Sequence, residues 1–172
     1  MAVRILQWNA NGLLSHSHEF RQYLTAQNFE VVCVQETFLK PGKVFCPPGY
    51  SCIRNDRVGH KGGLATYIRN GLKFTELQPP ANLECQAINI KSSAGSIIVI
   101  NLYLSPTDNV QPTALDGLFI NNRNVITIGD FNAKNRLWGS DHDDHRGLLV
   151  EDAITTHNYV VLNTGQGTYQ TS

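Results

Sequence analysis

The feature that most restricts the fold is a set of short apolar runs, rich in β-branched residues, that recur between turn signals. Four of them are the clearest: Val3 to Gln7, Val31 to Gln35, Ser96 to Leu102 and Asn124 to Ile128. Runs of this length and composition are typical of strands that are buried on both faces of a sheet. We therefore predict that these four segments are central strands.

Helices and further strands complete the predicted pattern. A helix is expected to begin at Ser17, whose hydroxyl can cap it, and four side chains then share one face: Phe20, Tyr23, Leu24 and Gln27. The middle of the chain predicts antiparallel strands, separated by the turns Asn70-Gly71 and Gln78-Pro79-Pro80: Gly63 to Ile68, Leu72 to Thr75 and Cys85 to Ile90. Weaker helices are predicted at Ala114 to Asn122 and Gly147 to His157. The fold class is therefore α/β.

The overall composition restricts the partners of the chain. With 172 residues and a formal net charge of zero, the chain has the size of one domain, and its charge gives no support to phosphate binding. One window of the sequence is locally basic, and Asp56 is its one acidic residue. It could line a face that binds a nucleic-acid backbone, or form ordinary solvated strand edges and turns: Arg54, Arg57, Lys61, Arg69 and Lys73. We find no signal peptide and no membrane-spanning run, and we expect a soluble, intracellular protein. The four cysteines are expected to be reduced thiols.

Polar side chains follow each of the four central runs. The two acidic ones are Glu36 and Asp130, and the others are amides or a phenol: Asn9, Asn11, Tyr103 and Asn132. Ligand sites of layered α/β proteins collect at strand ends, so these groups are expected to converge. Carboxylates beside amides suit a hard divalent cation such as Mg²⁺. Each residue taken alone is better explained as part of an ordinary turn or strand end, and only the set of six indicates a site.

Five ordered motifs resemble the endonuclease/exonuclease/phosphatase superfamily: Trp8-Asn9-Ala10-Asn11-Gly12-Leu13, Val34-Gln35-Glu36-Thr37, Gly62-Gly63-Leu64-Ala65, Asn101-Leu102-Tyr103 and Gly129-Asp130-Phe131-Asn132-Ala133. At position 11 the chain carries Asn, where apurinic-site repair enzymes carry Asp. An Asn at this position is similar to the pattern in the endonuclease domains of jockey-like non-LTR retrotransposons. So is the stretch from Asn132 through Trp138-Gly139-Ser140 to Arg146-Gly147. The resemblance covers the whole chain. It implies a four-layer α/β sandwich, with two mixed β-sheets face to face and helices outside.

The resemblance also implies roles for matching residues. Glu36 would bind Mg²⁺, with Mn²⁺ as an alternative, and Asn11 would be a second, water-mediated metal ligand. Asn9 would position the scissile phosphate or the catalytic centre, and Tyr103 would contact that phosphate. Asp130 would orient or deprotonate the attacking water, or assist the leaving group. Asn132 would hold the phosphate oxygens. Metal and amides would thus stabilise negative charge while a carboxylate handles the water.

The C-terminus differs from the family pattern. Family members continue through further strands to a closing Ser-Asp-His motif, whereas this sequence ends at Thr168-Tyr169-Gln170-Thr171-Ser172. We therefore expect residues 1–172 to be a single domain that is incomplete at its C-terminus, without the last strands and the catalytic His of that motif.

Two other histidine-containing segments have simpler interpretations. Ser140-Asp141-His142 spells the missing motif but follows Asp130 too closely, so we interpret it as a loop. The segment from Asp141 to His145 could bind a transition metal, although a polar, solvated loop is the preferred interpretation. His157 is interpreted as a helix-terminal or half-buried residue.

The leading hypothesis is a magnesium-dependent endonuclease, a hydrolase that nicks target DNA during retrotransposition. In a complete element it would share its chain with a reverse transcriptase, and the family implies a nuclear monomer without membrane contact. One alternative is a catalytically inactive remnant that at most binds nucleic acid. Another is a phosphatase of inositol-phosphate or sphingolipid headgroups, which Asn11 and Trp138-Gly139-Ser140 disfavour.

Overall fold

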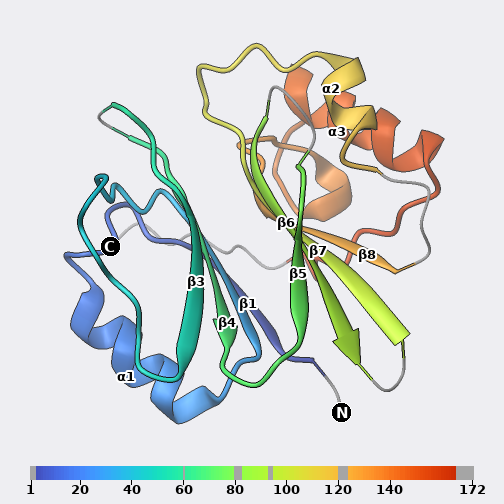
Figure 1. The fold of residues 1–172 in the computed structure, drawn as a ribbon. Coiled ribbons are helices and arrows are strands. Elements are labelled where there is room, and N and C mark those ends of the chain that lie inside the picture. The colour runs from blue at the N-terminus through green and yellow to red at the C-terminus, as the bar shows by residue number, and fades with distance from the viewer. Residues whose placement is uncertain (1–2, 60, 80–82, 93–94, 120–123, 166–172) are drawn as a thin grey trace.

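The chain folds into two β-sheets that pack face to face, with helices on their outer faces (Figure 1). The computed structural model describes residues 3–59, 61–79, 83–92, 95–119 and 124–165. The expected four-layer α/β sandwich is therefore confirmed.

The first sheet contains four strands in the order β1-β2-β4-β3. Their bounds are β1 Ile5–Asn9, β2 Val31–Gln35, β3 Tyr50–Asn55 and β4 Leu64–Arg69. β1 and β2 run parallel, and β4 is antiparallel to both of its neighbours. Helix α1, Ser17–Gln27, connects β1 to β2 and buries Phe20 and Leu24 against the outer face of this sheet.

The second sheet has the order β5-β6-β7-β8. Its bounds are β5 Phe74–Leu77, β6 Glu84–Ser92, β7 Gly95–Tyr103 and β8 Val125–Asp130. β6 is antiparallel to β5 and to β7, and β8 is parallel to β7. The predicted antiparallel pairing is confirmed for β5 and β6, whereas β4, the first strand of the predicted group, lies in the other sheet. The outer face of this sheet is covered by the remaining helical elements: α2 Pro112–Asp116, the 3₁₀ turn η1 Arg136–Trp138 and α3 His145–Thr156.

Along the central strands, successive side chains alternate between two apolar layers of the sandwich. In β2, Val31 and Cys33 face the second sheet, whereas Val32 and Val34 face α1. In β7, Val99 faces the first sheet, and Ile100 and Leu102 pack with α2 and α3. Successive side chains of a strand point to opposite faces, so each run fills two apolar layers. This is why these segments read as continuous apolar runs in the sequence.

Several boundaries differ from the sequence prediction. The strand β3 was not predicted, because its side chains are mostly half-buried and mix polar with apolar residues. Of the four runs predicted to be central, only β2 and β7 lie between two other strands, since β1 and β8 are terminal among the described strands and all their residues are half-buried. The expectation of four central strands is therefore wrong for the first and fourth runs. Both of those strands also extend further than predicted, to Asn9 and Asp130.

The helices also differ in detail. The N-cap of α1 is His16 rather than Ser17, and Tyr23 and Gln27 are exposed, so only half of the predicted apolar face is buried. The predicted helix from Ala114 to Asn122 is confined to α2, and residues 120–122 lie outside the described residues. α3 begins two residues earlier than predicted, because Asp144 caps it by accepting a hydrogen bond from the Gly147 amide.

Candidate active site

The candidate site lies where the carboxyl ends of two parallel strand pairs meet. Asn9 ends β1 and pairs with Gln35, the residue before Glu36, while Tyr103 ends β7 opposite Asp130 of β8. β1 of the first sheet also contacts β8 of the second. The sandwich thus brings the polar ends of both sheets to one place, as expected from the strand-end pattern.

Asn9 links the two carboxylates of the site. Its Nδ2 donates to Glu36 Oε1 at 3.0 Å and to Asp130 Oδ2 at 2.7 Å. The Asn9 Oδ1 accepts a hydrogen bond from the Asn11 amide at 3.0 Å. A backbone N–H can only donate, so this contact fixes which end of the Asn9 amide faces the carboxylates. Asn9 therefore supplies positive hydrogens between two groups that would otherwise repel each other.

The backbone at Glu36 adopts an uncommon conformation. Its φ is +49°, in the left-handed region, and its carbonyl accepts a hydrogen bond from Gly12 at 2.8 Å. The next residue, Thr37, is buried and donates its amide to Gly63 at 3.1 Å. A non-glycine residue in this region persists when its surroundings hold it there, and such positions cluster at functional sites. The surrounding loops thus direct Glu36 into the site.

Tyr103 is buried beside the same carboxylate. Burial of the phenol, followed by the nearby negative charges of Glu36 and Asp130, raises the pKa of Tyr103 above its ordinary value. The phenol therefore remains a hydrogen-bond donor at neutral pH. A protonated donor at this position suits the binding of an anion.

The turn after β8 orients Asp130 and Asn132. Asp130 Oδ1 accepts a hydrogen bond from the Asn132 amide at 2.9 Å, and Asn132 Nδ2 donates to the Leu104 carbonyl at 2.9 Å. Gly129 precedes them with φ of +154°, and a Cβ there would lie 1.9 Å from the Leu102 carbonyl oxygen. The glycine that precedes Asp130 is thus required by the close approach of β8 to β7.

A buried amide network lies behind the site, between the two sheets. Gln35 Nε2 donates to Asn101 Oδ1 at 2.7 Å, and Gln7 Nε2 donates to Gln35 Oε1 at 2.6 Å. Asn101 Nδ2 in turn donates to Thr66 Oγ1 at 3.1 Å and to the Ala65 carbonyl at 3.2 Å. Sequence reasoning missed this network, although a polar residue inside an apolar run was its visible signal. It joins both sheets directly beneath Glu36 and Tyr103.

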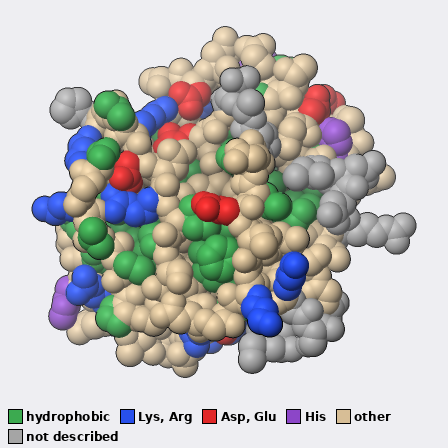
Figure 2. Space-filling model, in the orientation of Figure 1, with side chains coloured by type: hydrophobic (Ala, Val, Ile, Leu, Met, Phe, Trp, Pro, Cys, Tyr) green, Lys and Arg blue, Asp and Glu red, His purple; other side chains and the backbone are tan. Residues whose placement is uncertain are grey.

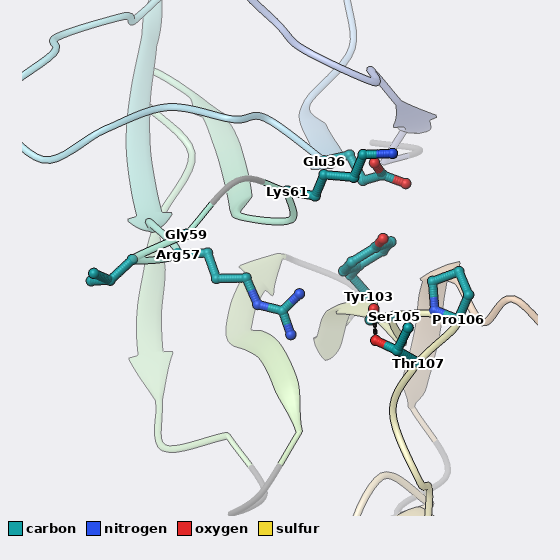
Figure 3. Close-up of a pocket in the computed structure, with 9 residues that line it drawn as sticks. Glu36, Arg57, Gly59, Lys61, Tyr103, Ser105, Pro106 and Thr107 are labelled. Carbon is teal, nitrogen blue, oxygen red and sulfur yellow. Dashed lines mark hydrogen bonds between the residues drawn. The ribbon is translucent and has the colours of Figure 1, made fainter.

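A pocket of about 470 Å³ opens beside Glu36 and Tyr103 (Figure 3). Its polar lining combines two cations with two hydroxyls: Arg57, Lys61, Ser105 and Thr107. The guanidinium of Arg57 points into the pocket from the loop before β4. The lining therefore offers hydrogen-bond donors and positive charge next to the carboxylate of the site.

Glu84, which the sequence analysis did not single out, supports this pocket. Its Oε1 accepts the Gly63 amide at 2.5 Å, and its Oε2 lies 3.3 Å from Arg57 Nε. Burial raises the pKa of Glu84, while the Gly63 amide and Arg57 oppose that rise. Nothing in the local sequence marks Glu84, since its partners come from distant loops.

The basic window of the sequence does not form one surface. Arg54 pairs with Asp56 at 2.6 Å, and Arg69 donates to the Phe29 carbonyl at 3.0 Å. Arg57 and Lys61 line the pocket. In Figure 2, Lys and Arg side chains toward the left of the view have Asp and Glu side chains beside them. Several of these cations thus stabilise the fold, and two face the candidate site.

The donor set at the site fits a hard divalent cation of the magnesium type. Glu36 is a half-buried carboxylate with one oxygen bonded to Asn9, and Asn11 is exposed next to it in the hydrogen-bonded turn. Mg²⁺ commonly binds through one or two carboxylates and retains several waters. Within the described residues, no group of three or more His, Cys, Asp or Glu side chains is arranged to hold a metal. Glu36 and Asn11 would therefore hold the ion together with water.

The other histidine segments lie apart from this chemistry. Asp141 and His142 are exposed and pair with each other at 2.6 Å, which agrees with a polar, solvated loop. His157 Nε2 lies 3.0 Å from Asp116 Oδ1, and its ring stacks on Phe119. His157 is thus a half-buried residue at the C-terminus of α3 that connects this helix to the segment around α2.

Among the described helices, none has the length and apolar character needed to span a bilayer.

A family model described as the endonuclease/exonuclease/phosphatase family matches residues 6–172. The chain is 26% identical over 173 residues to the RNA-directed DNA polymerase from mobile element jockey of Drosophila funebris, and 29% identical to its counterpart in Drosophila melanogaster. These alignments cover 97% of this chain and 19% of each relative, so the chain spans about a fifth of their length.

A solved structure shares the fold. The endonuclease domain of TRAS1, a telomere-specific non-LTR retrotransposon, superimposes with a TM-score of 0.78 at 21% sequence identity. The match covers 95% of this chain and 76% of that domain. The two mixed sheets and their outer helices are therefore the fold of a known endonuclease domain.

Proposed function

The chain belongs to the endonuclease/exonuclease/phosphatase family, and on that premise we propose that it is a magnesium-dependent endonuclease that hydrolyses DNA phosphodiester bonds. The observation that supports this most strongly is the bridge from Asn9 to both Glu36 and Asp130. It places an orientated carboxylate, a candidate metal ligand and a neutral donor within hydrogen-bonding reach of one another. That combination suits attack of water on a phosphodiester.

In the proposed reaction, Asp130 accepts a proton from the attacking water. Its two oxygens are held by Asn9 Nδ2 and by the Asn132 amide, so the carboxylate is fixed in orientation before the substrate binds. Proton transfer by a positioned carboxylate lowers the barrier to attack of the water oxygen on phosphorus. As the bond from phosphorus to the leaving sugar oxygen breaks, that oxygen takes up a proton from solvent water, and Asp130 returns its proton to solvent.

The negative charge that develops on the phosphate is met by neutral donors and by the metal. Tyr103 keeps its proton and can donate to a phosphate oxygen, and Asn132 has a second Nδ2 hydrogen besides the one that it donates to Leu104. Preorganised donors of this type lose little energy in reorganising during the reaction. When bound by Glu36 and Asn11, Mg²⁺ would supply Lewis-acid stabilisation of the same charge.

The biological role that we propose is nicking of target DNA during retrotransposition. The relatives of this chain are named as RNA-directed DNA polymerases from mobile elements, and the solved neighbour is the endonuclease domain of a retrotransposon. A reverse transcriptase on the same polypeptide is the proposed partner, and the nucleus is the proposed site of action, because the target is chromosomal DNA. A monomer suffices, since the proposed catalytic residues come from one chain.

Nicking of a supercoiled plasmid by the purified chain tests this proposal. We expect conversion to the relaxed form in Mg²⁺, loss of conversion in EDTA, and no release of phosphate from inositol phosphates or other small phosphomonoesters. A folded chain that leaves the plasmid supercoiled would support the alternative of an inactive remnant. Phosphate release without nicking would support the phosphatase alternative instead.

A further inference from the structure

The N-terminus of α3 presents an arginine to two loops of the candidate site. Arg146 Nη1 donates to the carbonyls of Phe131 and Asn132, at 3.4 and 3.2 Å. Its Nη2 donates to the carbonyls of Pro106 and Asp108, at 3.3 and 2.8 Å. The first pair belongs to the loop after β8 and the second to the loop after β7. One planar guanidinium therefore joins the loop that carries Asn132 to the loop that follows Tyr103.

The backbone of Arg146 is itself held firmly in place. Asp144 caps α3 through the Gly147 amide at 2.6 Å, and its own amide donates to the Lys134 carbonyl at 2.9 Å. A Cβ on Gly147 would lie 1.8 Å from that carbonyl oxygen. Only glycine allows α3 to approach the loop after β8 this closely. The Arg-Gly pair of the sequence thus forms one unit, in which glycine permits the approach and arginine makes the link.

The linked loops carry the groups that the proposed mechanism uses. Asn132 Nδ2 donates to the Leu104 carbonyl at 2.9 Å, so the two loops also meet at Asn132 itself. On the other side, the Asp108 carboxylate accepts the Ser105 amide at 3.0 Å and lies 3.7 Å from Arg57. These contacts extend the link to the pocket beside Glu36 and Tyr103.

We propose that Arg146 is a positioning residue that acts through Asn132. It contacts neither the carboxylates nor, in our mechanism, the phosphate, but it fixes the loop on which Asn132 is presented. The effect of Arg146 on catalysis rests on the proposed function, whereas its effect on the two loops does not. Lysine cannot replace arginine here, because a single ammonium group lacks the planar fork that reaches carbonyls on two loops. A displacement of about 1 Å at a catalytic group can lower the rate by as much as a hundredfold.

The test compares Arg146→Lys with Arg136→Lys as a matched control. Arg136 is an exposed arginine of η1 that pairs with Asp143 at 2.9 Å, outside the two loops. For Arg146→Lys we expect faster amide hydrogen exchange in residues 104–108 and 130–133, and a kcat for plasmid nicking about tenfold lower at an unchanged KM. For Arg136→Lys we expect exchange and kcat to remain as in the wild type.

A double-mutant cycle with Asn132→Ala separates positioning from general stability. If Arg146 acts through Asn132, Arg146→Lys lowers kcat about tenfold in the wild type and hardly at all in the Asn132→Ala background. Independent, multiplicative losses would overturn the proposal, as would wild-type exchange in Arg146→Lys. A wild-type chain that does not nick counts against the proposed function, whereas the exchange measurement still decides the role of Arg146.

Discussion

At the scale of single residues, the site depends on a neutral side chain between two acidic ones. Asn9 donates to Glu36 and Asp130 from one nitrogen, and its other end is fixed by the amide of Asn11. An aspartate has nearly the same shape but replaces the donor with a third negative charge. Replacing Asn9 with aspartate therefore changes the charge of the side chain while nearly keeping its shape.

We predict that Asn9→Asp loses about a hundredfold in nicking rate and unfolds at a lower temperature than the wild type. The reason is that like charges at hydrogen-bonding distance repel each other. Asn163→Asp is the matched control, because Asn163 is an exposed asparagine that belongs to no part of the candidate site. A thermal melt and a nicking assay of both variants check this, and equal behaviour of the two would contradict the role given to Asn9.

A second residue-scale prediction concerns Gly129. Gly129→Ala is expected to destabilise the fold by about 3 kcal/mol or more, because its Cβ would lie 1.9 Å from the Leu102 carbonyl oxygen. Gly71→Ala is the control, since Gly71 also has positive φ, at +94°, but a Cβ there meets nothing within 4 Å. Its expected cost is about 1 kcal/mol. Urea denaturation of both variants gives the comparison, and a cost for Gly129→Ala no larger than that of the control would be inconsistent with the packing described.

At the scale of secondary-structure elements, the amide network fixes one sheet against the other. Gln35 of β2 and Asn101 of β7 meet through a hydrogen bond of 2.7 Å in the buried layer between the sheets. A buried amide is costly unless it forms hydrogen bonds. This pair therefore favours the observed placement of one sheet on the other over shifted placements that would break its hydrogen bond. The ends of β2 and β7, which carry Glu36 and Tyr103, are thereby set relative to each other.

We predict that Asn101→Leu lowers the free energy of unfolding by about 2 kcal/mol, because Gln35 Nε2 loses its acceptor at 2.7 Å and Thr66 Oγ1 loses the hydrogen bond that it accepts. Gln35→Leu alone is expected to be similarly costly. The double variant Gln35→Leu/Asn101→Leu should lose less than the sum of the two, since both partners are then apolar. Urea denaturation measures all three, and additive losses would argue against a direct interaction.

The elements also show what the sequence could and could not predict. Strand ends marked by Glu36 and Asp130 were visible because they follow clear apolar runs, and their convergence follows from the general behaviour of α/β sheets. β3 was missed because its half-buried residues lack a clear period. Glu84 and Arg146 were not identified as site residues because their partners, Arg57 and the loops after β7 and β8, are distant in sequence. Contacts between distant segments leave no local pattern.

At the scale of the whole molecule, buried thiols predict how stability varies with pH. Burial raises the pKa of Cys33 and Cys52 from 9.0 to about 12 in each case. The folded chain therefore keeps protons that the unfolded chain releases above pH 9. This contribution to stability is fully present below pH 9 and is lost as the pH rises towards 12.

We accordingly expect the free energy of unfolding to fall between pH 9 and pH 11, by roughly 1 kcal/mol or more for a fully buried thiol. Cys33→Ala should show a shallower fall than the wild type, even though the smaller side chain lowers stability at neutral pH. Urea denaturation across this pH range checks the prediction. A wild-type slope in Cys33→Ala would show that Cys33 does not titrate as described.

For the whole molecule, we propose that the strand ends of two sheets form a site that cuts DNA. Its most direct test is the rate of plasmid nicking in Mg²⁺ for the wild type, Glu36→Gln and Asp130→Asn, with Glu76→Gln, an exposed position of β5, as the control. We expect nicking by the wild type and by Glu76→Gln, and a loss of at least about a hundredfold in the other two variants. Equal nicking by Glu36→Gln or Asp130→Asn, or none by a folded wild type, would contradict it.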